Sequence, residues 1–298
     1  GKKKLKRYPV RLNYPKWLIH SWIKHYGLEK AEKIFEACLQ EPMLDISVKS
    51  APSYWAKKLD GQVLASGSIR RKLSGRIENL PGYDEGAWWV QDAGATLPVQ
   101  LFGKLNGANV LDVCAAPGGK TAQLLCGGAN VTAIDISDVR IRLLKENLDR
   151  LGLKAELIHA DIKKWTTSRL FDFIFLDAPC SATGTIRRNP DILIHKTYED
   201  VQKLSIIQME ILQKVAKLVR PGGQLVYCTC SLQYEEGEAQ VDRFLSKNTG
   251  FSRDPISLNE IGSFSDAINV NGDLRLLPYH LNQNEGVDGF FASRLTRK

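Results

Sequence analysis

Thiols and a carboxylate occur in two short segments that each follow an apolar run. The first reads DAPC, from Asp177 to Cys180, and the second reads CTCS, from Cys228 to Ser231. If these runs are neighbouring strands of one sheet, their side chains meet at its carboxyl edge. A thiolate can then bond to a substrate, a second thiol can assist release of the product, and a carboxyl group can hydrogen-bond the substrate.

This combination of groups suits alkylation of a pyrimidine at carbon 5. Carbon 5 is a poor nucleophile, so a thiolate first adds to carbon 6 and the resulting enamine carbon attacks the alkyl donor. The attacking thiol must ionise, and a basic site favours that. Alternation along a strand places Cys228 and Cys230 on one face, so their spacing does not choose the nucleophile. A small core residue is the plainer interpretation of a cysteine in a strand, and we apply it to Cys228.

A glycine turn lies upstream in the sequence NVLDVCAAPGGKT, from Asn109 to Thr121. The apolar residues at its start predict a buried strand, and the paired glycines predict a tight turn into a helix, where backbone N–H groups approach a bound ligand. Neither a GxGxxG nor a GxxxxGK[ST] pattern is present, which argues against NAD and ATP. Taken alone, the turn could equally be a plain connection.

Strand and helix patterns then alternate, which predicts a mostly parallel sheet with helices on both faces. The expected strands are 130–136, 155–161, 171–178 and 224–230, with an antiparallel pair at the sheet edge from 273–277 and 289–295. Acidic residues end three of them. Asp135, about twenty residues past the turn, suits ribose hydroxyls, and Asp161 is placed to meet an adenine amino group. An adenosine cofactor without phosphates, S-adenosylmethionine, fits this pattern.

The region before the glycine turn predicts a smaller unit. We expect a small α/β module over residues 1–80 and the main domain over 81–298. Residues 15–41 read as two short helices that meet near Gly27, and 44–77 mixes short strands with one helix. Arg70 and Arg71 belong to a basic cluster that is a candidate phosphate contact, with a solvated surface as the equal alternative.

Composition limits the classes of protein that the chain can be. It has 298 residues with a formal net charge of +8, which favours a polyanionic partner such as RNA. No apolar run is long enough to span a bilayer, and the basic lead-in of residues 1–13 has no apolar signal region behind it. The six cysteines form neither a disulfide ladder nor paired CxxC motifs. We therefore expect a cytoplasmic monomer with reduced thiols and no metal.

The motifs together resemble those of a known family. The segments CAAPGGKT, DAPCSATGTIRRNPDI, YCTCSL and DGFFASRL are similar to those of the RNA cytosine-C5 methyltransferases. This family includes the bacterial Sun/Fmu-type (RsmB-like) 16S rRNA enzymes and the eukaryotic Nop2/NSUN proteins. The likeness runs from about Trp17 to the C-terminus. Sun-type members usually carry a further all-helical domain ahead of this region.

The resemblance implies a Rossmann-like class I S-adenosylmethionine-dependent methyltransferase with a small N-terminal α/β RNA-binding domain. It implies that Cys230 is the nucleophile, that Cys180 aids product release and that Asp177 lies near both methyl group and base. Arg187 and Arg188 would lie at the RNA entrance, with a salt-bridged surface pair as the alternative. The implied cofactor contacts are Cys114, Ala115, Ala116, Pro117, Gly118, Gly119, Lys120, Asp135, Asp161 and Asp177.

The expected activity is methylation of a cytidine in RNA, with small-subunit ribosomal RNA as the expected substrate. Three alternatives remain open. The first is the same chemistry on tRNA, and the second is an RNA-binding ribosome assembly factor without turnover, against which the intact Cys180, Cys230 and Asp177 argue. The third is an amine or protein methyltransferase. Such an enzyme is expected to have an Asn/Asp-Pro-Pro-Tyr element at the position where this chain has DAPC.

Overall fold

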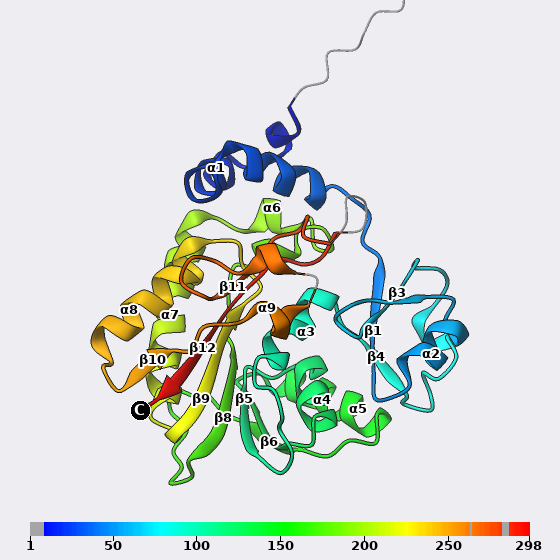
Figure 1. The fold of residues 1–298 in the computed structure, drawn as a ribbon, viewed down its shortest axis with the longest axis vertical. Helices are drawn as coiled ribbons and strands as arrows, with labels where there is room; N and C mark the ends of the chain where they lie inside the picture. Colours follow the sequence, from blue (N-terminus) through cyan, green and yellow to red (C-terminus); the bar gives the residue numbers. More distant parts are fainter. Residues whose placement is uncertain (1–8, 263, 282–285) are drawn as a thin grey trace, which may run out of the picture.

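Two β-sheets form the framework of the molecule (Figure 1). The computed structural model describes residues 9–262, 264–281 and 286–298, so most of the basic lead-in lies outside the described residues. Among the described residues, no helix is long and apolar enough to cross a membrane.

Five strands of the large sheet run parallel, in the order β9-β8-β5-β6-β7. They are β5 (Asn109–Val113), β6 (Asn130–Asp135), β7 (Glu156–His159), β8 (Phe171–Asp177) and β9 (Val219–Thr229). Side chains alternate between the two faces. Along β5, for example, Val110 packs with helices on one face, whereas Leu111 and Val113 pack on the other. The predicted parallel sheet is thus confirmed.

Helices cover both faces of this sheet. On one face lie α3 (Ala93–Gln100), α4 (Gly119–Cys126) and α5 (Asp138–Arg150), and on the other lie α7 (Tyr198–Ala216) and α8 (Glu238–Lys247). The amphipathic pattern of α5 buries Leu144 and Leu148 and leaves its charged residues outside. This arrangement puts the carboxyl ends of all five parallel strands at one edge.

The antiparallel part is larger than the sequence predicted. The expected pair is present as β11 (Leu274–Leu276) and β12 (Phe290–Arg297). This pair belongs to the antiparallel edge of the sheet, as predicted, where β12 pairs with β9 on one side and with β10 (Phe251–Arg253) on the other. The short β10 was missed, since three partly buried residues give no clear alternation.

The small sheet has the strand order β2-β3-β1-β4. Its strands are β1 (Leu44–Val48), β2 (Gln62–Val63), β3 (Ile69–Arg71) and β4 (Trp88–Val90), and α2 (Pro52–Lys58) packs on them. We predicted a boundary between residues 80 and 81 and expected the following segment to pack on the main domain. The segment contacts both parts of the molecule: β4 pairs with β1 of the small sheet, whereas Trp89 and α3 pack in the core of the large sheet.

The first helix, α1 (Lys16–Cys38), packs away from the small sheet (Figure 1). It is kinked at Gly27, whose φ of 76° is open to glycine at little cost, which agrees with the predicted break. Its buried Leu18 and Trp22 share a core with Ile186 and Leu232 of the large domain. The Tyr26 hydroxyl donates to the Leu232 carbonyl at 2.6 Å, so α1 supports the loop after β9.

Short elements complete the described chain. They are η1 (Val10–Asn13), η2 (Ile77–Asn79), η3 (Thr183–Thr185), α6 (Ile192–His195), η4 (Tyr234–Glu236), α9 (Leu258–Ile261) and η5 (Ser265–Ala267).

Candidate active site

The glycine turn lies at the carboxyl end of β5 and leads into α4. Gly118 has a φ of +105°, and a Cβ there would come within 3.1 Å of Leu144, so the turn needs glycine at this position. Side chains of α5 hold the turn from outside. The Asn147 amide donates to the Pro117 carbonyl at 2.9 Å, and Arg140 donates to the Ala116 carbonyl. The turn is therefore a fixed backbone frame.

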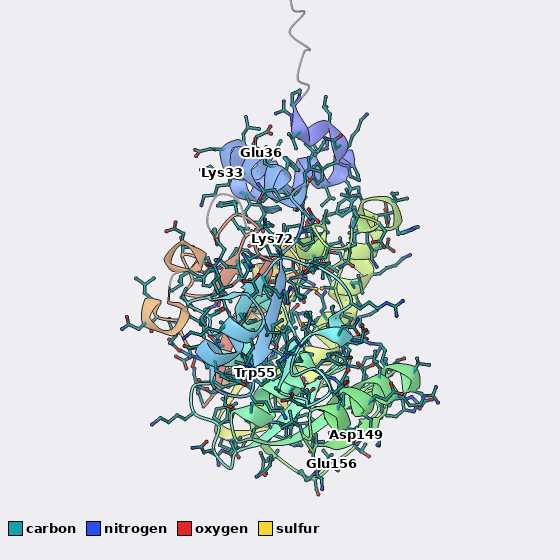
Figure 2. All side chains as sticks on the ribbon, turned by 90° about the vertical axis from the view of Figure 1, so that its right-hand side faces the viewer. Lys33, Glu36, Trp55, Lys72, Asp149 and Glu156 are labelled. Atoms are coloured by element: carbon teal, nitrogen blue, oxygen red, sulfur yellow. The ribbon has the colours of Figure 1, made fainter. Side chains whose placement is uncertain are left out.

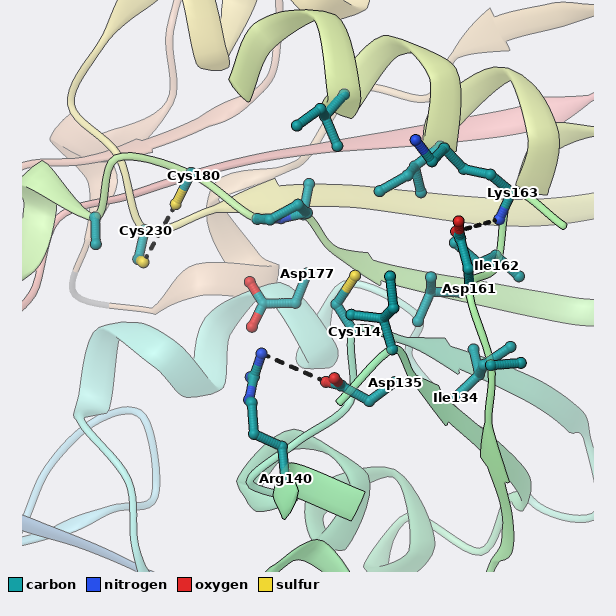
Figure 3. A pocket seen from close by; sticks show the side chains of 18 residues that line it. Cys114, Ile134, Asp135, Arg140, Asp161, Ile162, Lys163, Asp177, Cys180 and Cys230 are labelled. Atoms are coloured by element: carbon teal, nitrogen blue, oxygen red, sulfur yellow. Dashed lines mark hydrogen bonds and ion pairs between the residues drawn. The ribbon is translucent and has the colours of Figure 1, made fainter. Parts of the chain in front are cut away.

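A cavity of about 390 Å³ opens beside this turn (Figure 3). Its size lies within the roughly 300–1,000 Å³ that small-molecule sites occupy. Its apolar wall comes from isoleucines of β6, α7 and the loops beside them. The polar lining contains the side chains that the sequence predicted: Cys114, Asp135, Asp161, Asp177, Cys180 and Cys230.

Two of these carboxylates lie where β6 and β7 end. Asp135 ends β6 and accepts hydrogen bonds from the Ala116 and Ser137 backbone N–H groups at 3.2 and 3.0 Å. The Arg140 guanidinium forms an ion pair with Asp135, with Nη1 3.5 Å from Oδ2 (Figure 3). Asp161 follows β7 and is partly exposed to the cavity, with one oxygen bonded to the Lys163 N–H at 3.0 Å. Both carboxylates keep acceptor capacity for a ribose and an adenine amino group.

An ion pair joins the glycine turn to the DAPC segment. Lys120 Nζ donates to Asp177 Oδ2 at 2.7 Å, and the Cys228 thiol donates to Asp177 Oδ1 at 3.5 Å. Burial by itself would lower the pKa of Lys120. The nearby Asp177 carboxylate, through its charge and its hydrogen bond, has the larger effect, so the pKa of Lys120 lies above its ordinary value. Burial also raises the pKa of the Cys228 thiol, which fits the predicted role of Cys228 as a core residue.

The two remaining thiols lie side by side at the cavity wall. Cys180 Sγ and Cys230 Sγ are 3.5 Å apart, and Asp177 points into the same space (Figure 3). The hydrogen bond with Cys230, followed by burial, raises the pKa of the Cys180 thiol. The structure therefore brings together the three residues that the sequence singled out, from strands β8 and β9 and the loops after them.

Asp112, within the NVLDVCAAPGGKT segment, is a further carboxylate of this site. It is buried on β5, where the Thr121 hydroxyl donates to Oδ2 at 2.6 Å and Oδ1 has no hydrogen-bond partner among the described residues. Burial raises the pKa of Asp112 to about 7. The residue lines an adjoining cavity of about 250 Å³ that shares Cys114 and Asp177 with the larger one. Its unpaired oxygen is suited to an amino group of a ligand.

These donors and acceptors fit S-adenosylmethionine. The apolar wall can hold the adenine, Asp161 and Asp135 can meet its amino group and ribose, and Asp112 can meet the amino group of the methionine part. The sulfonium would then lie toward Asp177 and the two thiols.

The predicted RNA contacts at Arg70 and Arg187 need correction. Arg70 is fully buried, and its Nε and Nη2 both donate to Asp45 at 2.7 Å, so it has no surface to offer a phosphate. Arg187 is also buried, within 3.5 Å of Asp92 and Asp288. A basic sequence cluster does not reveal whether an arginine has an acidic partner from another element.

Arg188 and Arg71 are more accessible. Arg188 shares the acidic partners of Arg187, yet its side chain is 23% exposed and it lines the smaller cavity. Arg71 is partly exposed on β3. Both remain predicted RNA contacts.

Comparison with known proteins decides the family. A sequence model described as 16S rRNA methyltransferase RsmB/F matches residues 99–296. The chain belongs to this family. The predicted family, its enzyme class and its use of S-adenosylmethionine are thereby confirmed.

Individual relatives of the RsmB/F family agree with this. The probable ribosomal RNA small subunit methyltransferase B of Bacillus subtilis is 33% identical over 99% of this chain and 68% of its own length. The corresponding protein of Salmonella arizonae is 39% identical over 78% of this chain, which spans about half (52%) of that relative. A methyltransferase homolog from Pyrococcus horikoshii has a similar structure, with a TM-score of 0.79, 27% identity and 97% of both chains covered.

Proposed function

We propose that this chain transfers a methyl group from S-adenosylmethionine to carbon 5 of a cytidine in 16S rRNA, through a covalent bond between Cys230 and carbon 6. The observation that carries the proposal is the pair of thiols, 3.5 Å apart, on the wall of the cavity that also contains Asp135 and Asp161. A single thiol would suffice for a structural role, whereas two thiols beside a cofactor site suit bond formation and release.

The steps follow from the positions of the side chains. The target cytidine must leave its stack to reach the cavity. Cys230 Sγ, as the thiolate, adds to carbon 6, and the electron pair of the ring forms the new bond from carbon 5. When bound, S-adenosylmethionine supplies an electrophilic methyl group for that bond. A base then removes the proton from carbon 5, the carbon–sulfur bond breaks, and Cys230 leaves as a thiolate, with Cys180 assisting this release.

Asp177 acts on the base during the addition, and Lys120 orients Asp177. The Asp177 carboxyl can hydrogen-bond the Watson–Crick edge of the cytosine and support its protonation as the thiolate adds. Lys120, paired with Asp177 at 2.7 Å, holds that carboxyl in place. Without this orientation, the base would be free to turn away from Cys230.

The small sheet offers a surface for RNA. The exposed cations on it and on the adjoining α2 and loops include Lys57, Lys58, Lys72 and Arg76. Figure 2 shows Lys72 on the face that the small sheet turns to the viewer, between the first helix and the end of α5. Cations on one face supply the salt-dependent part of RNA affinity.

The test uses labelled methyl transfer into RNA from cells that lack this gene, followed by nucleoside analysis and sizing. Label in 5-methylcytidine of small-subunit RNA supports the proposal, whereas label in tRNA keeps the chemistry and replaces the substrate. We expect Cys230→Ala to abolish transfer and Cys180→Ala to accumulate a covalent RNA adduct. Cys126→Ala, at an exposed thiol, is the control. Equal and adduct-free loss in both active-site variants would overturn the assignment of roles.

An RNA-binding assembly factor that keeps the cofactor site is the second candidate. It would bind S-adenosylmethionine and RNA but give no label on free RNA or on isolated ribosomal subunits.

A further inference from the structure

Glu236 is a buried carboxylate that contacts both loops carrying the active-site thiols. Its Oε1 accepts a hydrogen bond from the Ser181 N–H at 2.9 Å, and its Oε2 accepts one from the Ser181 hydroxyl at 2.5 Å. The Ser231 hydroxyl donates to the same Oε2. Ser181 follows Cys180 directly, and Ser231 follows Cys230. One carboxylate therefore bonds the residue next to each thiol.

We propose that Glu236 is a positioning residue that sets the spacing and orientation of the Cys180 and Cys230 thiols. The proposal rests on the proposed function, because it assigns Glu236 a part in that reaction. Glu236 does not line the thiol cavity, so it acts through the two serines and not on the substrate.

Glu236 is itself firmly anchored. Gln208 of α7 donates to Oε1 at 3.1 Å, and the Tyr227 hydroxyl of β9 donates to the Glu236 backbone carbonyl at 2.8 Å. Burial raises the pKa of Glu236, and the hydrogen bonds to its two oxygens oppose that rise. A buried carboxylate is costly unless such donors surround it. An apolar residue could fill the space, but it could not bind two loops at once.

Other bonds also join the two loops, and one of them links the residues beside the thiols: the Ser181 and Ser231 hydroxyls lie 3.2 Å apart, and the Thr183 hydroxyl lies 3.3 Å from that of Ser231. Gly184 N–H donates to the Cys230 carbonyl at 2.9 Å, and Leu232 N–H donates to the Thr183 hydroxyl at 3.0 Å. These bonds remain when the Glu236 side chain is removed. We therefore expect the variant Glu236→Ala to keep the overall fold, while the two thiols are held less firmly because only contacts between hydroxyl groups that can rotate remain beside them.

The conservative variant Glu236→Gln separates positioning from charge. A glutamine oxygen can accept from Ser181 N–H and Gln208, and its amide can donate to the serine hydroxyls, which rotate to accept. The arrangement of loops is then kept without the negative charge. Glu235→Ala is the matched control, because Glu235 lies on the same turn and its carboxylate accepts only from the Tyr198 hydroxyl among the hydrogen bonds of the described residues.

The first measurement does not depend on methylation. Diamide oxidises two neighbouring thiols to a disulfide and is itself reduced to the hydrazine, and peptide mass spectrometry follows formation of the Cys180–Cys230 bond. In Glu236→Ala we expect this rate to fall on the order of tenfold, since reactions between held groups depend steeply on their orientation. Glu236→Gln and Glu235→Ala should react at the rate of the unmodified chain. An unchanged rate in Glu236→Ala overturns the proposal.

The second measurement is kinetic. With Glu236→Ala we expect kcat for RNA methylation to fall on the order of tenfold to a hundredfold, with the Kd for S-adenosylmethionine unchanged and activity restored in Glu236→Gln. Equal loss of cofactor affinity and kcat would indicate a general structural role and overturn the proposal. If the unmodified chain fails to methylate RNA while the disulfide rates differ as expected, the proposed function fails and the positioning role stands.

A second variant covers the case in which Glu236→Ala does not fold. Ser231→Ala removes the hydroxyl donor beside Cys230 and leaves the carboxylate with its other donors. It should also slow formation of the Cys180–Cys230 disulfide, and a rate equal to that of the unmodified chain would overturn the proposal.

Discussion

Lys120 Nζ lies 2.7 Å from Asp177 Oδ2, which joins the glycine turn after β5 to the end of β8. The pair is mostly buried, with 15% of the lysine side chain and 27% of the aspartate side chain exposed. It couples the glycine turn to the side of the cavity that carries the thiols.

Breaking this pair should affect the reaction more than cofactor binding. We expect Lys120→Met to lower kcat on the order of 100-fold, because Asp177 loses the partner that orients it. Rapid-quench kinetics and calorimetry of S-adenosylmethionine binding measure the two effects separately. Lys145→Met, at a 65% exposed lysine of α5, is the control. Unchanged kcat in Lys120→Met would count against a catalytic role for the pair.

Asp135 should determine cofactor affinity. Removing a charged hydrogen-bond acceptor costs about 1.5–3 kcal/mol, so Asp135→Ala should raise the Kd for S-adenosylmethionine roughly 10- to 150-fold. The variant also leaves the Ala116 and Ser137 N–H groups without their acceptor. Asp138→Ala, nearby and 53% exposed, should bind normally in calorimetry. Equal affinities for both variants would exclude Asp135 from the ribose site.

Asp112 should make stability depend on pH. Burial raises its pKa to about 7 in the folded chain, whereas the unfolded value is about 3.9. Between these values the folded state holds a proton that the unfolded state releases, so the free energy of unfolding falls as pH rises from about 4 to about 7. Above that range this contribution is constant.

The variant Asp112→Asn removes this titration and keeps an acceptor for Thr121. Urea unfolding at several pH values should show the unmodified chain losing stability relative to Asp112→Asn through that window, with a constant difference above it. A difference that does not change with pH would show that Asp112 does not titrate there.

The exposed cations of the small sheet should govern the salt dependence of RNA binding. If Lys72 and Arg76 each contact a phosphate, alanine at either position lowers the slope of log K against log salt by about 1. Lys247→Ala on α8, on the far side of the large sheet, should leave the slope unchanged. Filter binding over a range of salt concentrations measures this. If neither substitution changes the slope, RNA binds at another surface of the chain.

The sequence predicted the parallel sheet and its carboxyl edge because both depend on local patterns. Buried strands read as apolar runs, and Asp135, Asp161 and Asp177 stand where such runs end. The meeting of Cys180 and Cys230 follows, because β8 and β9 are neighbours in the sheet.

Features that depend on long-range partners were not predictable. Nothing in the sequence near Arg70 indicates that Asp45 is its ion-pair partner. Similarly, the four donors to the carboxylate of Glu236 come from α7 and from the two loops that carry the thiols. Glu235 and Glu236 are adjacent in the sequence, and only the folded chain distinguishes the buried Glu236 from the partly exposed Glu235. Likewise, the place of β12 between β9 and β10 depends on its pairing with both strands.

That place of β12 affects how the chain matures during synthesis. The strand β9 carries Cys228 and leads to Cys230, and its second neighbour is supplied by residues 290–297. Until those residues leave the ribosome, β9 has one unpaired edge and the loop that bears Cys230, the proposed nucleophile, lacks its final support. A nascent chain can thus complete its nucleotide-binding turn early, but it gains a competent pair of thiols only after its last strand has been inserted.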